Sequence, residues 1–296
     1  MSTSWTRLGR FEVAIVSGGA MRIDGGAMFG VVPRVMWEPK IAPDEHNRIP
    51  MDNVILVLRG GGATILVDSG YGSTPSARDR SFLGLEEGHP LVRNLESAGV
   101  RPEDVDLLIL THLHFDHVGG CTQRDAAGRA SLVFPNARHV AQRAEWEDAT
   151  GEKPELANAY TPRDLHPIQQ SGALELIDGE TEVFLGVKVV PVGGHTRGHQ
   201  VVVVGRGADR IVCLADMCPT RHHVRPYWTL AYDQFPLEAR RVKPIVLRQI
   251  ADAGAIAVFG HETTLPAARL KIAADGQIQI AEAVALTQPG RPVSAA

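Results

Sequence analysis

Short runs of aliphatic and β-branched residues recur along the chain, separated by glycine, proline and polar residues. The runs that predict strands cover residues 12–16, 54–58, 64–67, 107–110, 183–190, 201–204, 211–214 and 256–259. Most of these runs are apolar at successive positions rather than at alternate ones, which is typical of strands covered on both faces. The pattern therefore predicts sheets that face each other, with helices on their outer sides.

Helical periodicity lies between these runs. Leu91, Leu95 and Ala98 share one face of a short helix, and Gly99 is a residue type that commonly ends one. A longer helix is predicted over residues 237–253, where Pro244 predicts a kink or a late start.

The chain shows no Ser/Gly linker, charge block or long-period repeat that divides it. We therefore expect one α/β (α+β) domain over residues 1–286, with an N-terminal segment at 1–50. The stretch 287–296 is polar and contains two prolines, which predicts a flexible tail.

The composition is ordinary for a globular protein of 296 residues, with 44% hydrophobic and 22% charged residues. The net charge of -4 and the lack of a basic stripe argue against a nucleic-acid partner. No apolar run approaches the ~18 residues that span a membrane, and the polar start lacks the apolar centre of a secretory signal. We therefore expect a cytoplasmic protein.

The three cysteines are Cys121, Cys213 and Cys218. Their odd number and the lack of a Cys-x-x-Cys pair argue against a disulfide framework or a structural zinc knuckle. We expect small buried thiols, with a thiolate metal ligand as the alternative.

The most informative motif follows the run 107–110 directly and reads Thr-His-Leu-His-Phe-Asp-His-Val-Gly-Gly over residues 111–120. In an extended chain His112 and His114 point to the same side and can bind one ion. Asp116 and His117 are adjacent, so a turn there directs them towards a second ion. A polar loop of satisfied histidines is the alternative, and four ligand-type residues within six positions argue against it.

Further ligand-type residues follow the later apolar runs: His199 precedes the run 201–204, Asp216 follows 211–214, and His261 follows 256–259. Loops at strand ends can bring such residues together from distant parts of a chain. The sequence thus predicts a first ion bound by His112, His114 and His199, and a second bound by Asp116, His117 and His261. Asp216 is placed to bridge them.

These motifs together resemble the metallo-β-lactamase superfamily over roughly residues 54–261. The resemblance rests on the HxHxDH run, the Gly-His-Thr-Arg-Gly-His segment at 194–199, the Leu-Ala-Asp segment ending at Asp216 and the Phe-Gly-His segment ending at His261. It implies a four-layer αββα sandwich with the metals at one edge of the two sheets. It also implies that His199 rather than His195 is the ligand, and that Asp68 orients a ligand histidine through its free ring nitrogen.

Within the superfamily the chain is similar to quorum-quenching lactonase-like and organophosphate hydrolase-like members. Asp216 separates it from the β-lactamases. Fewer than forty residues follow His261, so we do not expect the inserted domain of nucleic-acid-cleaving members. The segment 24–37 and the segment from Asp216 to His223 resemble the lactonase-like group. Those enzymes carry a tyrosine three residues after the bridging aspartate, where this chain has Pro219. We expect either that the role of this tyrosine passes to His223, Tyr227 or Tyr232, or that the substrate differs.

The predicted reaction is the opening of an acyl-homoserine-lactone-like ring, or cleavage of a carboxylic ester, by a hydroxide that bridges two divalent ions. Zinc is the default metal, with manganese, iron or cobalt as alternatives. Asp116, His223 or Tyr232 is expected to protonate the leaving oxygen. Hydrolysis of an organophosphate or aryl ester at the same ions is the alternative, followed by thioester hydrolysis or a non-catalytic metal-binding role.

An apolar set of residues is predicted to contact a small hydrophobic ester or lactone. Its members lie mainly in the glycine-flanked segment 24–37 and are Met28, Phe29, Met36 and Trp37, with Tyr227 added from downstream. Their size and flexibility suit an acyl chain or an aryl group. The alternative is that these residues seal the edge of the sandwich or contact a second chain in a homodimer.

Overall fold

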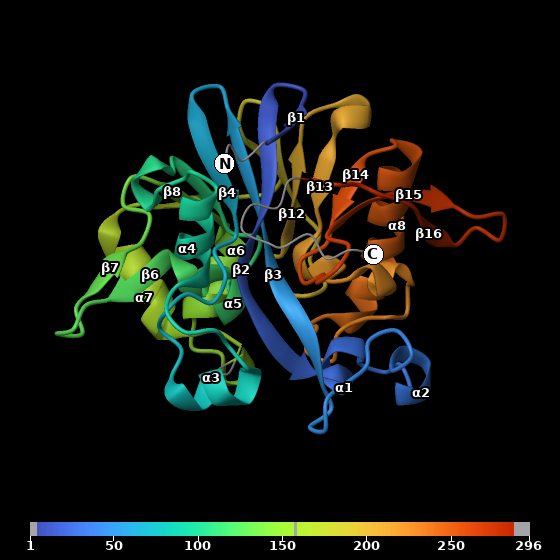
Figure 1. Cartoon of the computed structure of the whole chain (residues 1–296), viewed down its shortest axis with the longest axis horizontal. Coiled ribbons are helices and arrows are strands. Elements are labelled where there is room, and N and C mark those ends of the chain that lie inside the picture. Colours follow the sequence, from blue (N-terminus) through green and yellow to red (C-terminus); the bar gives the residue numbers. More distant parts are fainter. Residues whose placement is uncertain (1–4, 157–158, 287–296) are drawn as a thin grey trace.

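Two seven-stranded sheets face each other in the computed structural model, which describes residues 5–156 and 159–286 (Figure 1). The first sheet contains, in spatial order, β1 (Thr6–Leu8), β2 (Phe11–Asp24), β3 (Arg48–Gly60), β4 (Ala63–Val67), β5 (Leu107–Ile109), β8 (Arg138–Gln142) and β9 (Leu174–Ile177). The second contains β10 (Thr181–Phe184), β11 (Val187–Pro191), β12 (Gln200–Val204), β13 (Ile211–Cys213), β14 (Ile256–Val258), β15 (Ala267–Ile272) and β16 (Ile278–Ala283). A separate hairpin is formed by β6 (Thr122–Arg124) and β7 (Ala130–Leu132).

Helices cover the outer face of each sheet. The first sheet carries α4 (Pro90–Ser97), α6 (Arg143–Thr150) and α7 (Pro162–Ser171), and the second carries α8 (Pro236–Asp252). The shorter helices are α1 (Gly25–Phe29), α2 (Arg34–Trp37), α3 (Ala77–Leu83) and α5 (Phe115–Val118). Single 3₁₀ turns are η1 (Pro102–Asp104), η2 (Gly119–Cys121), η3 (Pro154–Leu156), η4 (Gly207–Asp209), η5 (Ala215–Met217) and η6 (Arg221–Val224). The predicted αββα sandwich is confirmed.

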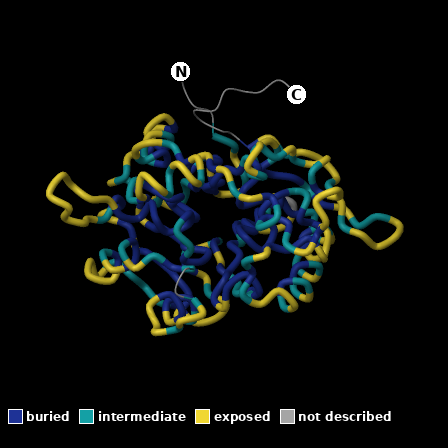
Figure 2. The backbone as a smooth tube through the Cα atoms, turned by 90° about the horizontal axis from the view of Figure 1, so that it is seen from below, coloured by how far each residue is buried: buried dark blue, intermediate teal, exposed yellow. Residues whose placement is uncertain are grey.

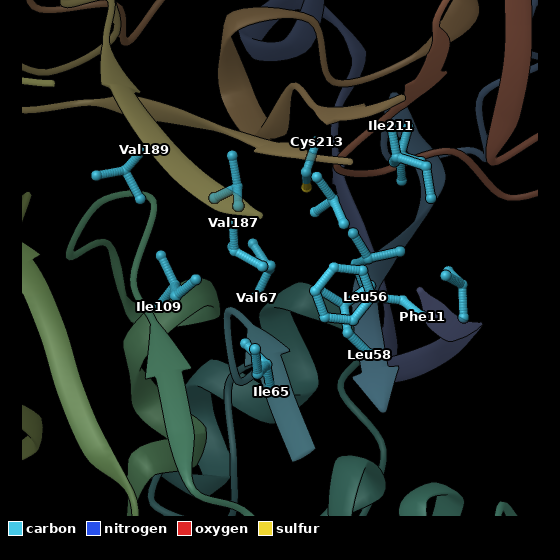
Figure 3. Close-up of a cluster of buried hydrophobic side chains, with 14 of the residues drawn as sticks. Phe11, Leu56, Leu58, Ile65, Val67, Ile109, Val187, Val189, Ile211 and Cys213 are labelled. Atoms are coloured by element: carbon cyan, nitrogen blue, oxygen red, sulfur yellow. The ribbon is translucent and has the colours of Figure 1, made fainter. Parts of the chain in front are cut away.

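The continuous apolar runs are explained by three buried layers. On β3, Leu56 and Leu58 face the layer between the sheets, whereas Ile55 and Val57 pack beneath the helices of the first sheet. The inner layer joins side chains of both sheets, such as Leu56 and Val189 (Figure 3). A third layer lies between the second sheet and α8. Strands at the centre are therefore buried on both faces, and exposure is concentrated in the peripheral loops (Figure 2).

Two predictions about local structure are corrected. The run 183–190 forms two strands, because Gly186 has a φ of 85° and turns the chain between β10 and β11. Of the two alternatives at Pro244, the late start is wrong, because α8 begins at Pro236 and continues through Pro244 to Asp252; the kink stays a prediction. Pro244 has no N–H group, so the helix lacks one backbone hydrogen bond there. Lys243 and Leu247, on either side of the proline, are buried, and their packing stabilises this turn of the helix.

The remaining structural predictions concern the short helix, the cysteines, the C-terminal stretch and the membrane. The short helix is confirmed as α4, and the three cysteines are buried and unpaired. The predicted tail at 287–296 lies outside the described residues. Among the residues that the structure does describe, no helix is long and apolar enough to cross a membrane.

Candidate metal centre

The four ligand-type residues of the HxHxDH run lie in the loop that follows β5. The chain remains extended at His114, and α5 then begins at Phe115 and turns it. This turn places Asp116 and His117 within a helical segment, as the change of direction in the motif predicts. All four side chains are therefore gathered at the carboxyl end of β5, which pairs in parallel with β4 and β8.

The structure brings seven histidine and aspartate side chains together in two groups. The first donor group consists of His112, His114, His195 and Asp216, and the second donor group consists of Asp116, His117 and His261. Within each group one potential ligand atom per residue lies within 4.8 Å of the others, and every residue is buried. Both groups are thus compact enough for one metal ion each.

The first donor group is assembled from three loops. His114 Nδ1 lies 3.1 Å from His112 Nε2 and 3.0 Å from His195 Nε2, so the three imidazoles converge on one point. Asp216, in η5 after β13, adds its Oδ2 at 3.3 Å from His195 Nε2. Three imidazole nitrogens and one carboxylate oxygen form a set that suits zinc and other divalent transition metals.

Asp216 also faces the second donor group with its other oxygen. Its Oδ1 lies 2.9 Å from His261 Nε2 and 3.4 Å from His117 Nε2. Asp116 Oδ2 lies 3.6 Å and 3.8 Å from the same two nitrogens. One carboxylate therefore presents an oxygen to each group, which is the arrangement that the sequence predicts for Asp216.

Hydrogen bonds fix the ring orientation of three histidines. Asp68 Oδ2 lies 2.9 Å from His117 Nδ1, as predicted, and Asp233 Oδ1 lies 2.8 Å from His195 Nδ1. The carbonyl oxygen of Asp52 lies 3.0 Å from His261 Nδ1. Each contact occupies one ring nitrogen and leaves the other directed at the donor groups, which is how surrounding residues set the tautomer of a metal-binding histidine.

The loops themselves are held by two buried carboxylates. Asp68 also accepts hydrogen bonds from the backbone N–H and the hydroxyl of Thr111, both at 2.8 Å. Its backbone φ of 64° is rare for a residue with a Cβ atom, so surrounding contacts must hold it.

Glu145 of α6 accepts from the N–H groups of Leu113 and Gly198 at 3.0 and 3.1 Å and from the Thr196 hydroxyl at 2.6 Å. Glu145 thus ties the loop of His112 and His114 to the loop of His195, a role for which the sequence offers no signal.

Electrostatics hold three of the donor residues in the forms that bind cations. Burial lowers the pKa of His112 and His114 well below its usual value, and neighbouring imidazoles add to the effect, so both rings are neutral. Burial raises the pKa of the Asp216 carboxyl, but His261, His117 and His195 outweigh it and hold that pKa well below its usual range. Neutral imidazole and ionised carboxylate are the forms required of metal ligands. Burial lowers the pKa of His117 and His195 as well, but neighbouring carboxylates outweigh it and hold the pKa of both rings above its usual value.

Two buried polar atoms at the site indicate whether its residues fit metal ions. His117 Nε2 and Asp216 Oδ1 have no hydrogen-bond partner among the described residues. A buried polar atom without a partner is destabilising, and a bound cation satisfies it. The residues present therefore fit a dinuclear metal site.

The prediction that His199 completes the first donor group is corrected, because the structure brings His195 there instead. Gly193 and Gly194 have φ values of 62° and 81°, and this turn carries His195 towards His114 and Asp233. His199 lies at the start of β12, where its carbonyl accepts from the N–H of Val192 at 2.9 Å. Its buried ring lies 5.2 Å from that of His112 but outside the donor group.

A cavity of about 460 Å³ lies beside both donor groups. His114, Asp116, Asp216 and Tyr232 line it, and Glu155 and Gln234 add polar groups. Its apolar walls are formed by Ile23, Ala27, Leu83, Phe115, Leu156 and Ala159. This size falls within the range of small-molecule sites, roughly 300–1,000 Å³.

None of the five residues predicted to form the substrate pocket lines this cavity. Phe29 and Trp37 are fully buried and stacked on each other, with ring centroids 5.3 Å apart, and they seal the edge of the sandwich with Met28. Met36 and Tyr227 are 47% and 70% exposed on the surface. Ala27 of the segment 24–37 and Ile23 near the end of β2 line the cavity instead, because the aromatic rings of the segment turn inward.

The candidate acid residues differ in their surroundings. His223 accepts a hydrogen bond from the Thr220 hydroxyl and donates one to the Met28 carbonyl, both at 2.8 Å. Burial lowers its pKa to about 3, so His223 is a neutral structural residue, and the prediction that it protonates the leaving group is corrected. Tyr232 does line the cavity, and its hydroxyl donates to the thioether sulfur of Met28 at 2.9 Å.

Comparison with known proteins agrees with this geometry. The sequence profile of the metallo-beta-lactamase superfamily matches residues 49–261. N-acyl homoserine lactonases of Bacillus cereus and of a Bacillus species are each 27% identical to this chain, over 212 and 236 residues. These matches cover 67% and 75% of this chain and 76% and 85% of the relatives.

Solved structures show the same fold. A probable metal-dependent hydrolase from Staphylococcus aureus has a TM-score of 0.81 at 28% identity, and the match covers 95% of this chain and 100% of that one. AidC, a dizinc quorum-quenching lactonase, has a TM-score of 0.77 at 22% identity, covering 95% and 97%. The two donor groups, the profile match and these relatives show that this chain is a hydrolase that belongs to the metallo-beta-lactamase superfamily.

Proposed function

We propose that this protein opens the ring of a lactone with a short or medium acyl chain, using two zinc ions. The observation that carries the proposal is the pair of donor groups that share Asp216 beside a cavity with mainly apolar walls. Support comes from the lactonase relatives, and zinc is supported by the imidazole-rich donor set and the dizinc neighbour. When bound, two divalent ions lower the pKa of water towards neutrality and polarise a carbonyl group.

Tyr232 is the candidate for orienting the substrate. Burial raises the pKa of its phenol well above the usual value, and Asp216 and Asp116 add to the effect, so the hydroxyl stays protonated at neutral pH. A thioether is a weak hydrogen-bond acceptor, so a substrate oxygen in the cavity can readily replace Met28 as the partner of this hydroxyl. Tyr232 would thereby take the place of the tyrosine that Pro219 replaces.

Asp116 is the candidate for carrying the proton to the leaving oxygen. It is the acidic residue of the second donor group and also lines the cavity, so its carboxylate lies between the donor atoms and the substrate space. A carboxylate within reach of both sides can accept a proton and return it to the alkoxide that leaves when the ring opens.

A substrate panel tests the proposed function. Metal-loaded protein is assayed with acyl homoserine lactones, simple lactones, aryl esters and phosphotriesters, and its metal content is determined by elemental analysis. We expect kcat/KM for one lactone class to exceed that for the other classes by at least about tenfold, or ~1.4 kcal/mol of transition-state stabilisation. Preference for a phosphotriester or aryl ester by the same margin would instead establish the alternative reaction.

The apolar wall of the cavity gives a second prediction. Ile23→Ala should raise KM for a lactone with a medium acyl chain several-fold, because the acyl chain loses contact with one or two methylene groups. It should change KM for an unsubstituted lactone little. Met36→Ala is the matched control, because Met36 is exposed and does not line the cavity. Equal effects of Ile23→Ala on both substrates would show that the acyl chain lies elsewhere.

A further inference from the structure

A second polar cavity, of about 310 Å³, lies apart from the metal centre. Its lining comes from Lys40 after α2, from η6 and Arg225, and from the segment Gln277 to Ile280 at the start of β16. In Figure 1, α2 and β16 lie on the same side of the molecule. The two cavities have no lining residue in common.

The charge of this cavity has one sign. Lys40, Arg221 and Arg225 line it, and its lining includes no carboxylate. Arg221 is neutralised by the buried Glu262, at 3.1 Å. In the described part of the chain, no ion pair joins Lys40 or Arg225 to an acidic residue, and the Arg225 guanidinium lies 4.9 Å from the centre of the Trp228 ring. The exposed cationic groups of Lys40 and Arg225 therefore line the cavity without an acidic partner among the described residues.

His222 supports the same conclusion from inside the cavity. Its Nε2 is buried and has no hydrogen-bond partner among the described residues. Burial lowers the pKa of this imidazole, and the charges of Arg221, Lys40 and Arg225 lower it further against the opposing effect of Glu262. The cavity thus has an excess of positive potential and an unsatisfied polar atom, both of which an oxyanion would relieve.

We propose that this cavity binds the phosphate or carboxylate group of a small metabolite, held by Lys40, Arg225 and Nε2 of His222. Gln277 and Gln279 add amide donors, and the apolar side chains of Val224, Ile278 and Ile280 line the same space and suit a compact organic body. Arginine and lysine are the usual partners of such oxyanions. This binding site is separate from the proposed lactone site and does not depend on it.

The test measures binding of inorganic phosphate, phenyl phosphate and benzoate to metal-loaded protein by titration calorimetry. Phenyl phosphate should bind more tightly than inorganic phosphate, and comparison with benzoate identifies the preferred oxyanion. Lys40→Glu combined with Arg225→Glu should weaken this binding at least about tenfold, equivalent to ~1.4 kcal/mol. Lys40→Glu alone serves as the second variant, because it leaves the contact of Arg225 with Trp228 in place.

The matched control is Arg7→Glu combined with Arg10→Glu, which makes the same charge change at exposed positions around the β1–β2 turn. It should weaken binding less than about twofold, since exposed charges at a distance are screened by salt. Inhibition of hydrolysis by the same anions reports any binding at the metal centre. Failure of the wild-type protein to bind any of the three anions would overturn the proposal. So would binding that survives the charge reversal and parallels inhibition, because the anion then occupies the metal centre only.

Discussion

The two donor groups of the metal centre are supported in different ways. In the first group, Glu145 accepts hydrogen bonds from the backbone of Leu113 and Gly198 and so holds two loops together. In the second group, the imidazole rings themselves are held, His117 by Asp68 and His261 by the carbonyl of Asp52. The first group therefore depends on how two distant loops meet as well as on the Asp233 carboxylate that orients His195, whereas the second depends mainly on the orientation of single side chains at the ends of strands.

This difference makes the two supports separable by mutation. Loss of a ring partner changes ligand orientation and basicity while the fold remains intact. Loss of a buried carboxylate that accepts hydrogen bonds from several backbone N–H groups leaves those N–H groups without partners, so it also lowers the free energy of unfolding.

Asp68→Asn should have the largest effect. Asp68 orients His117 and also holds Thr111, which immediately precedes His112, so the substitution disturbs both donor groups. We expect a loss of about 10- to 100-fold in metal affinity or activity, measured by titration against a chelating dye. Asp125→Asn on the exposed β6–β7 hairpin is the control and should behave as the wild type. A loss of less than about threefold for Asp68→Asn would contradict its orienting role.

Glu145→Gln should separate the two groups. Its amide NH₂ would face a backbone N–H that now donates to a carboxylate oxygen, so we expect the free energy of unfolding to fall by about 1–3 kcal/mol. Affinity for the first metal ion should fall with it, while affinity for the second is largely kept.

The control for this change is Glu147→Gln on the same helix. Glu147 is 57% exposed and forms an ion pair with Arg197 at 3.0 Å, so its loss should cost no more than about 1 kcal/mol. Equal weakening of both metal ions by Glu145→Gln would show that Glu145 does not act through the first group.

The smallest expected effect is that of His139, which belongs to neither donor group. This buried histidine makes the free energy of unfolding depend on pH. Burial lowers its pKa to about 4, whereas an unfolded histidine titrates near pH ~6.5. The unfolded state therefore binds more protons between these values, so the contribution of His139 to stability is fully present above pH ~6.5 and declines as pH falls towards 4. His139→Gln should remove this decline, a difference of under about 1 kcal/mol at pH ~6.

Denaturant unfolding at a series of pH values measures this difference. His46→Gln is the control, because the His46 side chain is 66% exposed. The same pH slope in wild type and His139→Gln would show that His139 is protonated as easily in the folded protein as in the unfolded one.

The sequence predicts those site residues that lie within one short motif or directly follow a strand. The spacing in the HxHxDH run, together with a ligand-type residue after each of two later strands, is sufficient for His112, His114, Asp116, His117, Asp216 and His261, because strand ends converge in this fold. The αββα layers follow in the same way from runs that are apolar on both faces.

The sequence does not distinguish features that depend on contacts between distant segments. His195 and His199 stand four residues apart in one glycine-rich loop, and what separates them is the turn at Gly193–Gly194 and the carboxylate of Asp233. Phe29 and Trp37 suit a substrate pocket equally well by composition, but packing against Trp228 and His223 turns them into the interior. Glu145 carries no motif and becomes recognisable only through its three loop contacts.

The most direct test of the account compares His195→Ala with His199→Ala, with metal content measured by elemental analysis and by chelator titration. We expect the wild-type protein and His199→Ala each to bind two ions per chain, whereas His195→Ala should bind the first ion at least about 100-fold more weakly. Retention of two tightly bound ions by His195→Ala, or loss of one ion from His199→Ala instead, would contradict it.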